Sequence, residues 1–457
     1  REMVFQRETS AFADAQEYLF KHALLREVTY ETVLLKLRRV YHRQVARWLE
    51  SAAGKRIGEY LGQIAGHYEL GGEGEKAVEY LLQAGDQARL AYACHEASGY
   101  YQRALRLLNE QGEKDQAART LMKLGLIYEL SFDYQRARQA YEQGFDLWQL
   151  AVEAQPAEDL PPAPHALRLP ASDPKTLDST KADDVISSAK TIQLFSGLVE
   201  LRPDAGVVPD VAQSWEVLEG GKKYIFHLRD DVLWSDGRPV TAGDFELAWK
   251  RVLADQTTMS IPRLLYDVKG ARSFHQGEIS DPESVGVKAL DDVTLAVELE
   301  GPTGYFLHLL ANAVAFPVPQ HVLAQHGEAW AEPEHIVTCG AFRLESWQPG
   351  ERMTMTRNPD YHGRFTGNVE CVELLLRDIG PTTDSEMLEM YEGDQLDLVE
   401  ISSSDANRVR QKYAGEYRRI PRLITLYLQF DVNCPPFDDV RVRRAFVLAT
   451  DREALVK

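Results

Sequence analysis

The pattern of apolar and polar positions is clearest near the middle of the chain, where a strand, a turn and a helix follow one another closely. Residues 223–228 alternate in the way of a strand that buries one face. Residues 235–237, Ser-Asp-Gly, are typical of a turn. Thr241 then precedes Asp244 by three positions, a variant of the capping box that begins helices. The apolar residues after it recur at helical spacing: Phe245, Ala248, Trp249 and Val252.

The first third of the chain has a different pattern, which predicts one helix after another. From Ala11 to about Gln155, prolines are scarce and strong helix formers dominate. Small and aromatic residues recur at the offsets of a tetratricopeptide repeat, whose small residues let paired helices cross closely. Three groups carry the pattern: Leu124, Gly125, Tyr128, Ala137, Tyr141 and Gly144; Ala65, Tyr68, Ala77, Leu81 and Ala84; and, more degenerate, Ala97, Tyr101 and Ala104. Residues 1–154 are therefore predicted to form an all-α tetratricopeptide-like solenoid of about three helical hairpins.

A proline-rich stretch separates this helical region from the rest. Residues 155–164 contain four prolines among alanines and acids, a composition that favours an extended, semi-rigid linker. After it, short alternating strands such as 294–299 and 352–356 are punctuated by Gly and Pro and mixed with helices. The sequence therefore predicts three parts: the helical repeats at 1–154, the linker at 155–164 and an α/β or α+β region at 165–457.

Composition excludes several classes of function. A formal net charge of -19 and a pI near 5.2 argue against a nucleic-acid partner, because phosphates need clustered Lys and Arg. The cysteines are dispersed and form no CxxC pair, so we expect no metal site, no cofactor and no disulfide framework, but small buried side chains. They are Cys94, Cys339, Cys371 and Cys434. No apolar run is long enough to span a membrane, and no secretory signal precedes the second region.

The second region resembles family 5 of the extracytoplasmic solute-binding proteins, the oligopeptide-binding and dipeptide-binding relatives that deliver ligands to ABC importers. The strand, turn and helix described above carry part of the resemblance. The other matching blocks follow in the family's order: 175–178, 192–198, 208–215, 286–292, 316–319, 339–344, 357–361, 436–443 and 451–454. The resemblance covers about residues 165–457. It implies a periplasmic-binding-protein-like (type II) domain with lobes I and II and the start of lobe III, incomplete at its C-terminus.

The resemblance also implies where a ligand binds, in a cleft between lobes that close about a hinge. Main-chain pairing with a peptide then gives affinity that is independent of its side chains. The loop and helix start at Asp184, Val185, Ile186 and Ser187 match the segment where the family's backbone meets the ligand. In the segment from Ile261 to Tyr266, Tyr266 matches an aromatic contact. Tyr427, Gln429 and Asp431 match the segment that crosses between the lobes.

Each of these residues has a plainer interpretation. Tyr266 is equally well read as an aromatic residue on the rim, and Tyr427 and Gln429 alternate as in a strand, where they would only pack. The family commonly has Asn where this chain has Asp431, and a carboxylate cannot donate as an amide does. The tryptophans Trp215, Trp234, Trp249 and Trp347 sit in apolar patterns and are predicted to be core residues.

Enzyme motifs are weak, and the sequence predicts a binding protein and not an enzyme. Ser187 and Lys190 match the S-x-x-K of serine acyl-transfer enzymes, but no Lys-Thr-Gly companion exists. The chain has no G-x-S-x-G elbow and no H-E-x-x-H helix. His321 and His326 are five positions apart and would not share a helical face as metal ligands, so we read them as surface or helix-end histidines.

A second resemblance concerns the start of the chain. Residues 18–31 resemble the junction that follows the nucleotide-binding module of large signalling ATPases, so we expect any such module to lie upstream of Arg1. Three interpretations stay open. The chain is a peptide-binding component of an ABC importer and extracytoplasmic, with an importer permease as partner, or it is a cytoplasmic sensor whose repeats contact a protein partner. A scaffold with a decayed binding lobe is a third.

Overall fold

A computed structural model describes most of the chain, which divides into a unit of residues 1–400 and a smaller unit of residues 401–457. The described residues are 3–7, 9–12, 15–154, 166–203, 206–255, 262–363, 365, 367–377, 384–402, 405–420, 427 and 429–451. The predicted linker at 155–164 lies outside them, so the domain boundary there stays a prediction. Among the described residues no helix is both long enough and apolar enough to cross a membrane.

The chain begins with a small hairpin and not with a helix. β1 (Val4–Gln6) pairs antiparallel with β2 (Tyr18–Phe20), and helices α1 (Ala23–Thr32) and α2 (Leu35–Ala53) follow. The prediction of helix from Ala11 was therefore wrong as far as Phe20. Tyr18, Leu19 and Phe20 have the aromatic and apolar character of a strand.

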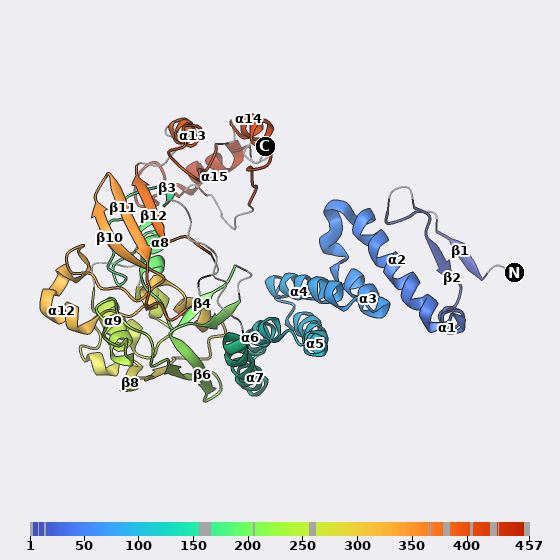
Figure 1. Cartoon of the computed structure of the whole chain (residues 1–457), viewed down its shortest axis with the longest axis horizontal. Helices are drawn as coiled ribbons and strands as arrows, with labels where there is room; N and C mark the ends of the chain where they lie inside the picture. Colours follow the sequence, from blue (N-terminus) through green and yellow to red (C-terminus); the bar gives the residue numbers. More distant parts are fainter. Residues whose placement is uncertain are drawn as a thin grey trace. The chain divides into compact units, whose positions relative to one another are not determined.

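The helices that follow form a repeat. They are α3 (Leu61–Gly71), α4 (Gly74–Leu90), α5 (Cys94–Gln111), α6 (Lys114–Leu130) and α7 (Tyr134–Ala154), each packed on the next (Figure 1). The turns recur forty positions apart: Gly72 and Gly112 are left-handed at the ends of α3 and α5. Tyr92 and Phe132 have positive φ after α4 and α6. This period is longer than the roughly 34 residues of a tetratricopeptide repeat.

The close crossing of these helices depends on two glycines in the same register. A Cβ at Gly85 would overlap the ring of Tyr101, and a Cβ at Gly125 would overlap the ring of Tyr141. Both tyrosines are fully buried, as are most small residues that the sequence pattern singled out. The prediction that small and aromatic residues interlock between paired helices therefore holds at these positions, whatever family the repeat belongs to.

The second region contains two four-stranded sheets. The first, in the order β6-β7-β9-β8, is antiparallel and consists of β6 (Ala212–Leu218), β7 (Lys223–Leu228), β8 (Val287–Asp291) and β9 (Thr294–Glu298). α9 (Ala242–Ala254) packs against β8 and β9 (Figure 1). The predicted capping box is present, and Asp244 of the box is buried and also accepts hydrogen bonds from Trp234 and the Gln320 backbone.

The second sheet joins distant parts of the chain. β10 (Phe342–Gln348), β11 (Arg352–Arg357) and β12 (Cys371–Leu376) are antiparallel, and β12 pairs in parallel with β3 (Leu167–Ala171). β4 (Val199–Leu201) and β5 (Val207–Pro209) form a separate hairpin. The remaining helices of this unit are α8 (Val185–Leu194), α10 (Ala271–His275), α11 (Phe306–Leu310), α12 (Gln320–His326) and α13 (Asp384–Glu392).

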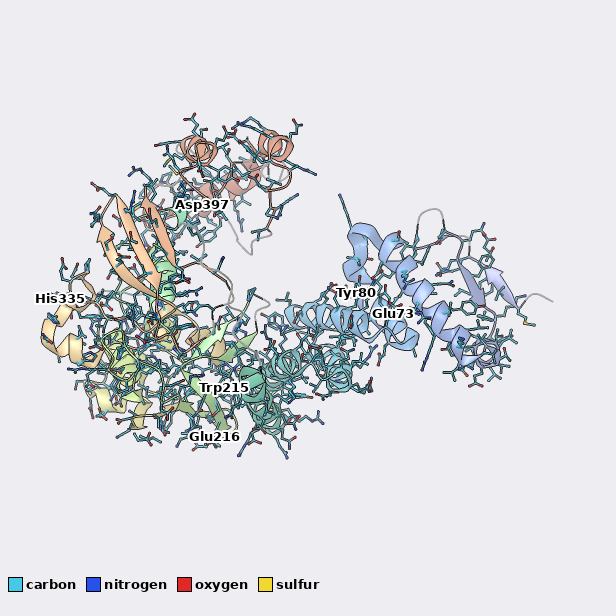
Figure 2. The ribbon with its side chains drawn as sticks, in the orientation of Figure 1. Glu73, Tyr80, Trp215, Glu216, His335 and Asp397 are labelled. Atoms are coloured by element: carbon cyan, nitrogen blue, oxygen red, sulfur yellow. The ribbon has the colours of Figure 1, made fainter. Side chains whose placement is uncertain are left out.

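One hydrophobic core runs from the helical repeats into the first sheet. Trp215 of β6 is labelled in Figure 2. Its ring stands edge-on to the rings of Tyr141 and Phe145 of α7, with ring centroids 5.3 Å and 4.7 Å apart. Gly221, after β6, has φ of 83° and lies under the ring of Tyr134, so it needs to be glycine for two reasons. We call the surface where α6 and α7 pack against β5, β6 and β7 the seam.

The smaller unit holds two helices, α14 (Ala406–Lys412) and α15 (Val440–Ala449). Tyr427 and Gln429 are exposed and lie outside any strand, so the expected strand alternation at these two residues was wrong. The prediction of buried cysteines holds for Cys339, whereas Cys434 is exposed, and all four cysteines are free thiols.

Candidate functional site

The loop that the family resemblance singled out leads into α8 and lines a pocket. Asp184 is the N-cap of α8: its carboxylate accepts hydrogen bonds from the Ser187 backbone N–H at 2.9 Å and from the Ser187 hydroxyl at 2.7 Å. The Ser187 oxygen in turn accepts the Lys175 backbone N–H at 3.0 Å. Burial alone would raise the pKa of Asp184, but the hydrogen bonds from Ser187 outweigh it and hold this pKa below its usual value.

These contacts leave the apolar side chains of α8 to face the pocket. The pocket has a volume of about 380 Å³. Its apolar walls are Ala182, Val185, Ala189, Ile192, Leu264, Ala313 and Val314, and its polar rim includes Asp183, Asp184, Ser188 and Asn312. Val185 is 85% exposed, which is unusual for a branched apolar side chain. We call this cavity the α8 pocket; a ligand in it would meet a largely apolar surface with a few polar groups.

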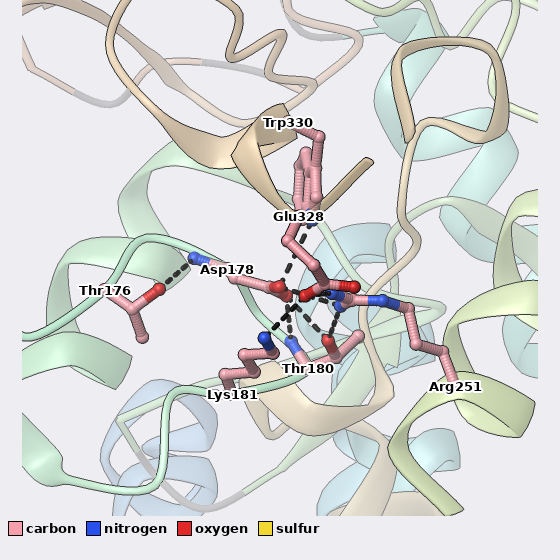
Figure 3. Close-up of polar contacts among 7 residues, drawn as sticks. All are labelled: Thr176, Asp178, Thr180, Lys181, Arg251, Glu328 and Trp330. Carbon is pink, nitrogen blue, oxygen red and sulfur yellow. Dashed lines mark hydrogen bonds and ion pairs between the residues drawn. The ribbon is translucent and has the colours of Figure 1, made fainter. Parts of the chain in front are cut away.

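A buried polar network holds the segment just before this loop (Figure 3). Asp178, whose side chain is 4% exposed, pairs with Arg251 of α9 at 2.7 Å and accepts the indole N–H of Trp330 at 3.2 Å. Its other oxygen accepts the backbone N–H and the hydroxyl of Thr180. Glu328 pairs with both Arg251 and Lys181. Arg251, Trp330 and Thr180 all hold the Asp178 carboxylate. Asp178 therefore fixes where the chain enters the α8 pocket.

The predicted site residues do not all come together. Asp184 and Val185 line the α8 pocket, Ile186 is 38% exposed beside it, and Ser187 is buried beneath it. Tyr266 does not line this pocket; its ring lies 5.9 Å from that of His275 and 5.3 Å from the guanidinium of Arg272. Ile261 lies outside the described residues.

The other three predicted site residues belong to the smaller unit. Tyr427 is 76% exposed and Gln429 is also exposed. Asp431 accepts the Asn433 backbone N–H at 3.0 Å and the Cys434 thiol at 3.1 Å, which lower its pKa. Its carboxylate thus caps a local turn, and it has no amide group to donate to a ligand.

The sequence interpretation missed the apolar half of the pocket. Val185, Ala189 and Ile192 recur at helical spacing, and this stripe was readable from the sequence alone. Leu264 and residues 312–314 come from distant loops and carried no such signal. The Ser187-Lys190 motif is accounted for structurally: the Ser187 hydroxyl donates to the Asp184 carboxylate that caps α8, and burial lowers the pKa of the Lys190 ammonium. No cluster of His, Cys, Asp or Glu suited to a metal ion occurs among the described residues.

The second region of the chain matches known proteins. The family model for bacterial extracellular solute-binding proteins, family 5 middle, matches residues 206–457. The chain belongs to this family. The "Probable deoxycholate-binding periplasmic protein YgiS" of Escherichia coli K12 is 39% identical over 288 residues, which are 63% of this chain and 53% of that protein. The "Periplasmic oligopeptide-binding protein OppA" of Salmonella typhimurium LT2 is 34% identical over 62% of this chain and 52% of that protein.

A solved structure agrees with these relatives in fold. That of Burkholderia pseudomallei OppA aligns with a TM-score of 0.58 and 32% identity, over 64% of this chain and 57% of its own. The α/β region is thus of the periplasmic-binding-protein type, as expected, and is preceded by a helical region. The chain spans about half the length of the curated relatives that it matches.

Proposed function

We propose that this chain binds short peptides or similar small solutes at the α8 pocket, as a substrate-binding component of ABC-type peptide transport or as a sensor derived from one. The observation that carries the proposal is that Asp184 and Val185, placed at the ligand by the family resemblance, line a cavity of suitable size. The name of the Salmonella relative supports a peptide as the ligand. A solute held by closure of lobes needs no reacting groups, and the hydroxyl of Ser187 already donates a hydrogen bond to the Asp184 carboxylate.

The apolar walls favour a second ligand class. The Escherichia coli relative is named for deoxycholate, a largely apolar carboxylic acid, and the α8 pocket has seven apolar lining residues. A peptide with apolar side chains and an amphipathic acid would both bury hydrocarbon against Val185 and Ile192. They differ in the main-chain hydrogen bonds that only a peptide can add.

The test is calorimetric titration of the chain with a mixed set of di- to pentapeptides and, separately, with deoxycholate. We expect peptides to bind, and Ala189→Glu to weaken binding about tenfold or more, because it places a carboxylate in the apolar wall. Gln193→Glu is the matched control: it adds the same charge to an exposed position of α8 outside the pocket lining, and should bind like the native chain. Absence of heat and of any melting shift with millimolar peptide refutes peptide binding, and binding of deoxycholate alone selects the second class.

For the helical region we propose a tetratricopeptide-like module that contacts a protein partner. The interlocking of small and aromatic residues supports this, although the forty-residue period is longer than the usual one. Such an array offers an extended surface for partners. If lobe closure accompanies ligand binding, the core shared across the seam would carry the change into α6 and α7, as a sensor requires.

A further inference from the structure

A second cavity lies at the seam, away from the α8 pocket. Its volume is about 430 Å³, within the range of pockets that hold small organic ligands. α6 contributes Arg119 and α7 contributes Trp148; the opposite wall comes from the hairpin β4-β5, the end of β11 and the loop after it. The cavity therefore exists only because the repeats are packed against the solute-binding region.

Basic groups are concentrated there, in a chain whose net charge is -19. Four arginines line the cavity: Arg119, Arg202, Arg229 and Arg357. Three carboxylates share it, and each is already engaged. Asp115 pairs with Arg119 at 2.9 Å, Glu200 with Arg202 at 3.5 Å, and Asp210 with the ring of His362 at 2.7 Å. Arg229 is held from outside the lining by Asp231.

The guanidinium groups retain unused donors. A guanidinium offers five N–H donors. Two nitrogens of Arg357 are engaged: one pairs with Glu370 at 2.9 Å and the other donates to the Gly367 carbonyl. Within the described part of the chain, the Nε of Arg119, of Arg202 and of Arg357 has no hydrogen-bond partner. The carboxylates thus hold these arginines in place but leave some of their N–H donors unused. A small shift of the guanidinium groups lets these donors turn toward an anion.

Aromatic rings complete the walls. Phe365 lies 4.1 Å below the guanidinium of Arg357 and 5.3 Å from the ring of Tyr361, and Trp148 lies 5.9 Å from the guanidinium of Arg119 on the facing side. Flat rings on two walls suit a planar ligand, which stacks on aromatic faces and on guanidinium planes. The aromatic walls of the cavity thus suit the ring of a ligand, and its arginines suit an anionic group of the same ligand.

We infer that the seam cavity binds a small organic anion that carries a planar ring, with the ring between Trp148 and Phe365 and the phosphate or carboxylate on the arginines. Such a ligand touches the repeats and the solute-binding region together. Its binding stabilises the packed seam by mass action, since it has no site on the separated parts. This inference is independent of what the α8 pocket binds.

The experiment titrates the chain with adenosine 5′-monophosphate, which combines a planar ring with a phosphate. Adenosine supplies the ring alone and inorganic phosphate the anion alone. We expect the nucleotide to bind about tenfold or more tighter than either part and to raise the melting temperature, because ring and anion contacts add. No heat and no melting shift at millimolar nucleotide overturns the inference, and so does equal binding of phosphate or of adenosine.

Matched variants locate the site. Arg357→Gln should weaken nucleotide binding about tenfold, because it removes an anion contact. Arg352→Gln is its control, since Arg352 lies on the same strand, pairs with Glu373 at 3.1 Å and is outside the cavity lining. Arg119→Gln, at a side chain 41% exposed, tests the facing wall with little risk to folding. If Arg357→Gln and Arg119→Gln bind the nucleotide as tightly as Arg352→Gln, the inference is wrong.

Discussion

Glu129 is a fully buried carboxyl group at the seam. It extends from α6 toward β7, where the Tyr224 hydroxyl donates to its Oε1 at 3.4 Å; Oε2 has no partner among the described residues. The rings of Tyr134 and Tyr141 on α7 complete its surroundings. Burial raises the pKa of Glu129 to about 8, and the nearby hydroxyl groups of Tyr141 and Tyr224 offset only part of this rise. The folded chain therefore keeps a proton that the unfolded chain releases near its ordinary pKa of 4.5.

The sign of the pH dependence follows from this difference. Between about pH 4.5 and pH 8 the folded state holds the extra proton, so Glu129 lowers the free energy of unfolding by about 1.4 kcal/mol for each pH unit of rise. We expect Glu129→Gln to be more stable than the native chain at pH 9 and to lose that advantage near pH 5. Urea denaturation at both pH values measures the difference, with exposed Glu142→Gln as control. A Glu129→Gln advantage that does not change with pH would contradict the assignment.

At the scale of elements, the helix pairs depend on glycines at their crossings, of which the sequence pattern had already marked Gly125. Gly125→Ala should destabilise the chain by about 1–3 kcal/mol, because its Cβ overlaps the ring of Tyr141 and α6 and α7 must separate. Gly99→Ala is the matched control, since Gly99 lies within α5 with no atom within 4 Å of the position of a Cβ. There the helix propensity of alanine should stabilise by about 0.5–1 kcal/mol. Thermal melts of the two variants should shift in opposite directions, and equal shifts would refute the packing role of Gly125.

The sequence predicted those elements whose signal is local. The strand at 223–228 and the capping box of Thr241 and Asp244 are present as predicted, because alternation and capping act within a few residues. The first hairpin was missed because Tyr18–Phe20 is too short a run to override a helical neighbourhood. In the site, the position of Asp184 was predicted, but the pocket walls at Leu264 and Ala313 were not, because long-range packing alone brings them to α8.

At the scale of the whole molecule, the seam decides whether the repeats and the first sheet behave as one body. Trp215→Ala removes the ring that Tyr141 and Phe145 contact, and should cost about 3–5 kcal/mol. We expect calorimetry to show the unfolding of the repeats separating from that of the solute-binding region, and hydrogen exchange in α7 to rise. Trp347→Phe, at a partly buried tryptophan away from the seam, serves as control. A variant that keeps the native unfolding profile would show that the two regions are coupled by other contacts.

Tyr141 makes two packing contacts. Its ring packs on Gly125 within the last helix pair, and it contacts Trp215 across the seam. Among the described residues, the helices of the repeat that enter the hydrophobic core shared with the first sheet are α6 and α7. The earlier helices of the repeat thus take no part in this shared core. Duplication or deletion of one forty-residue block ahead of α5 would lengthen or shorten the helical array. The packing of α6 and α7 on the first sheet would stay the same, so proteins of this architecture can differ in the length of the array.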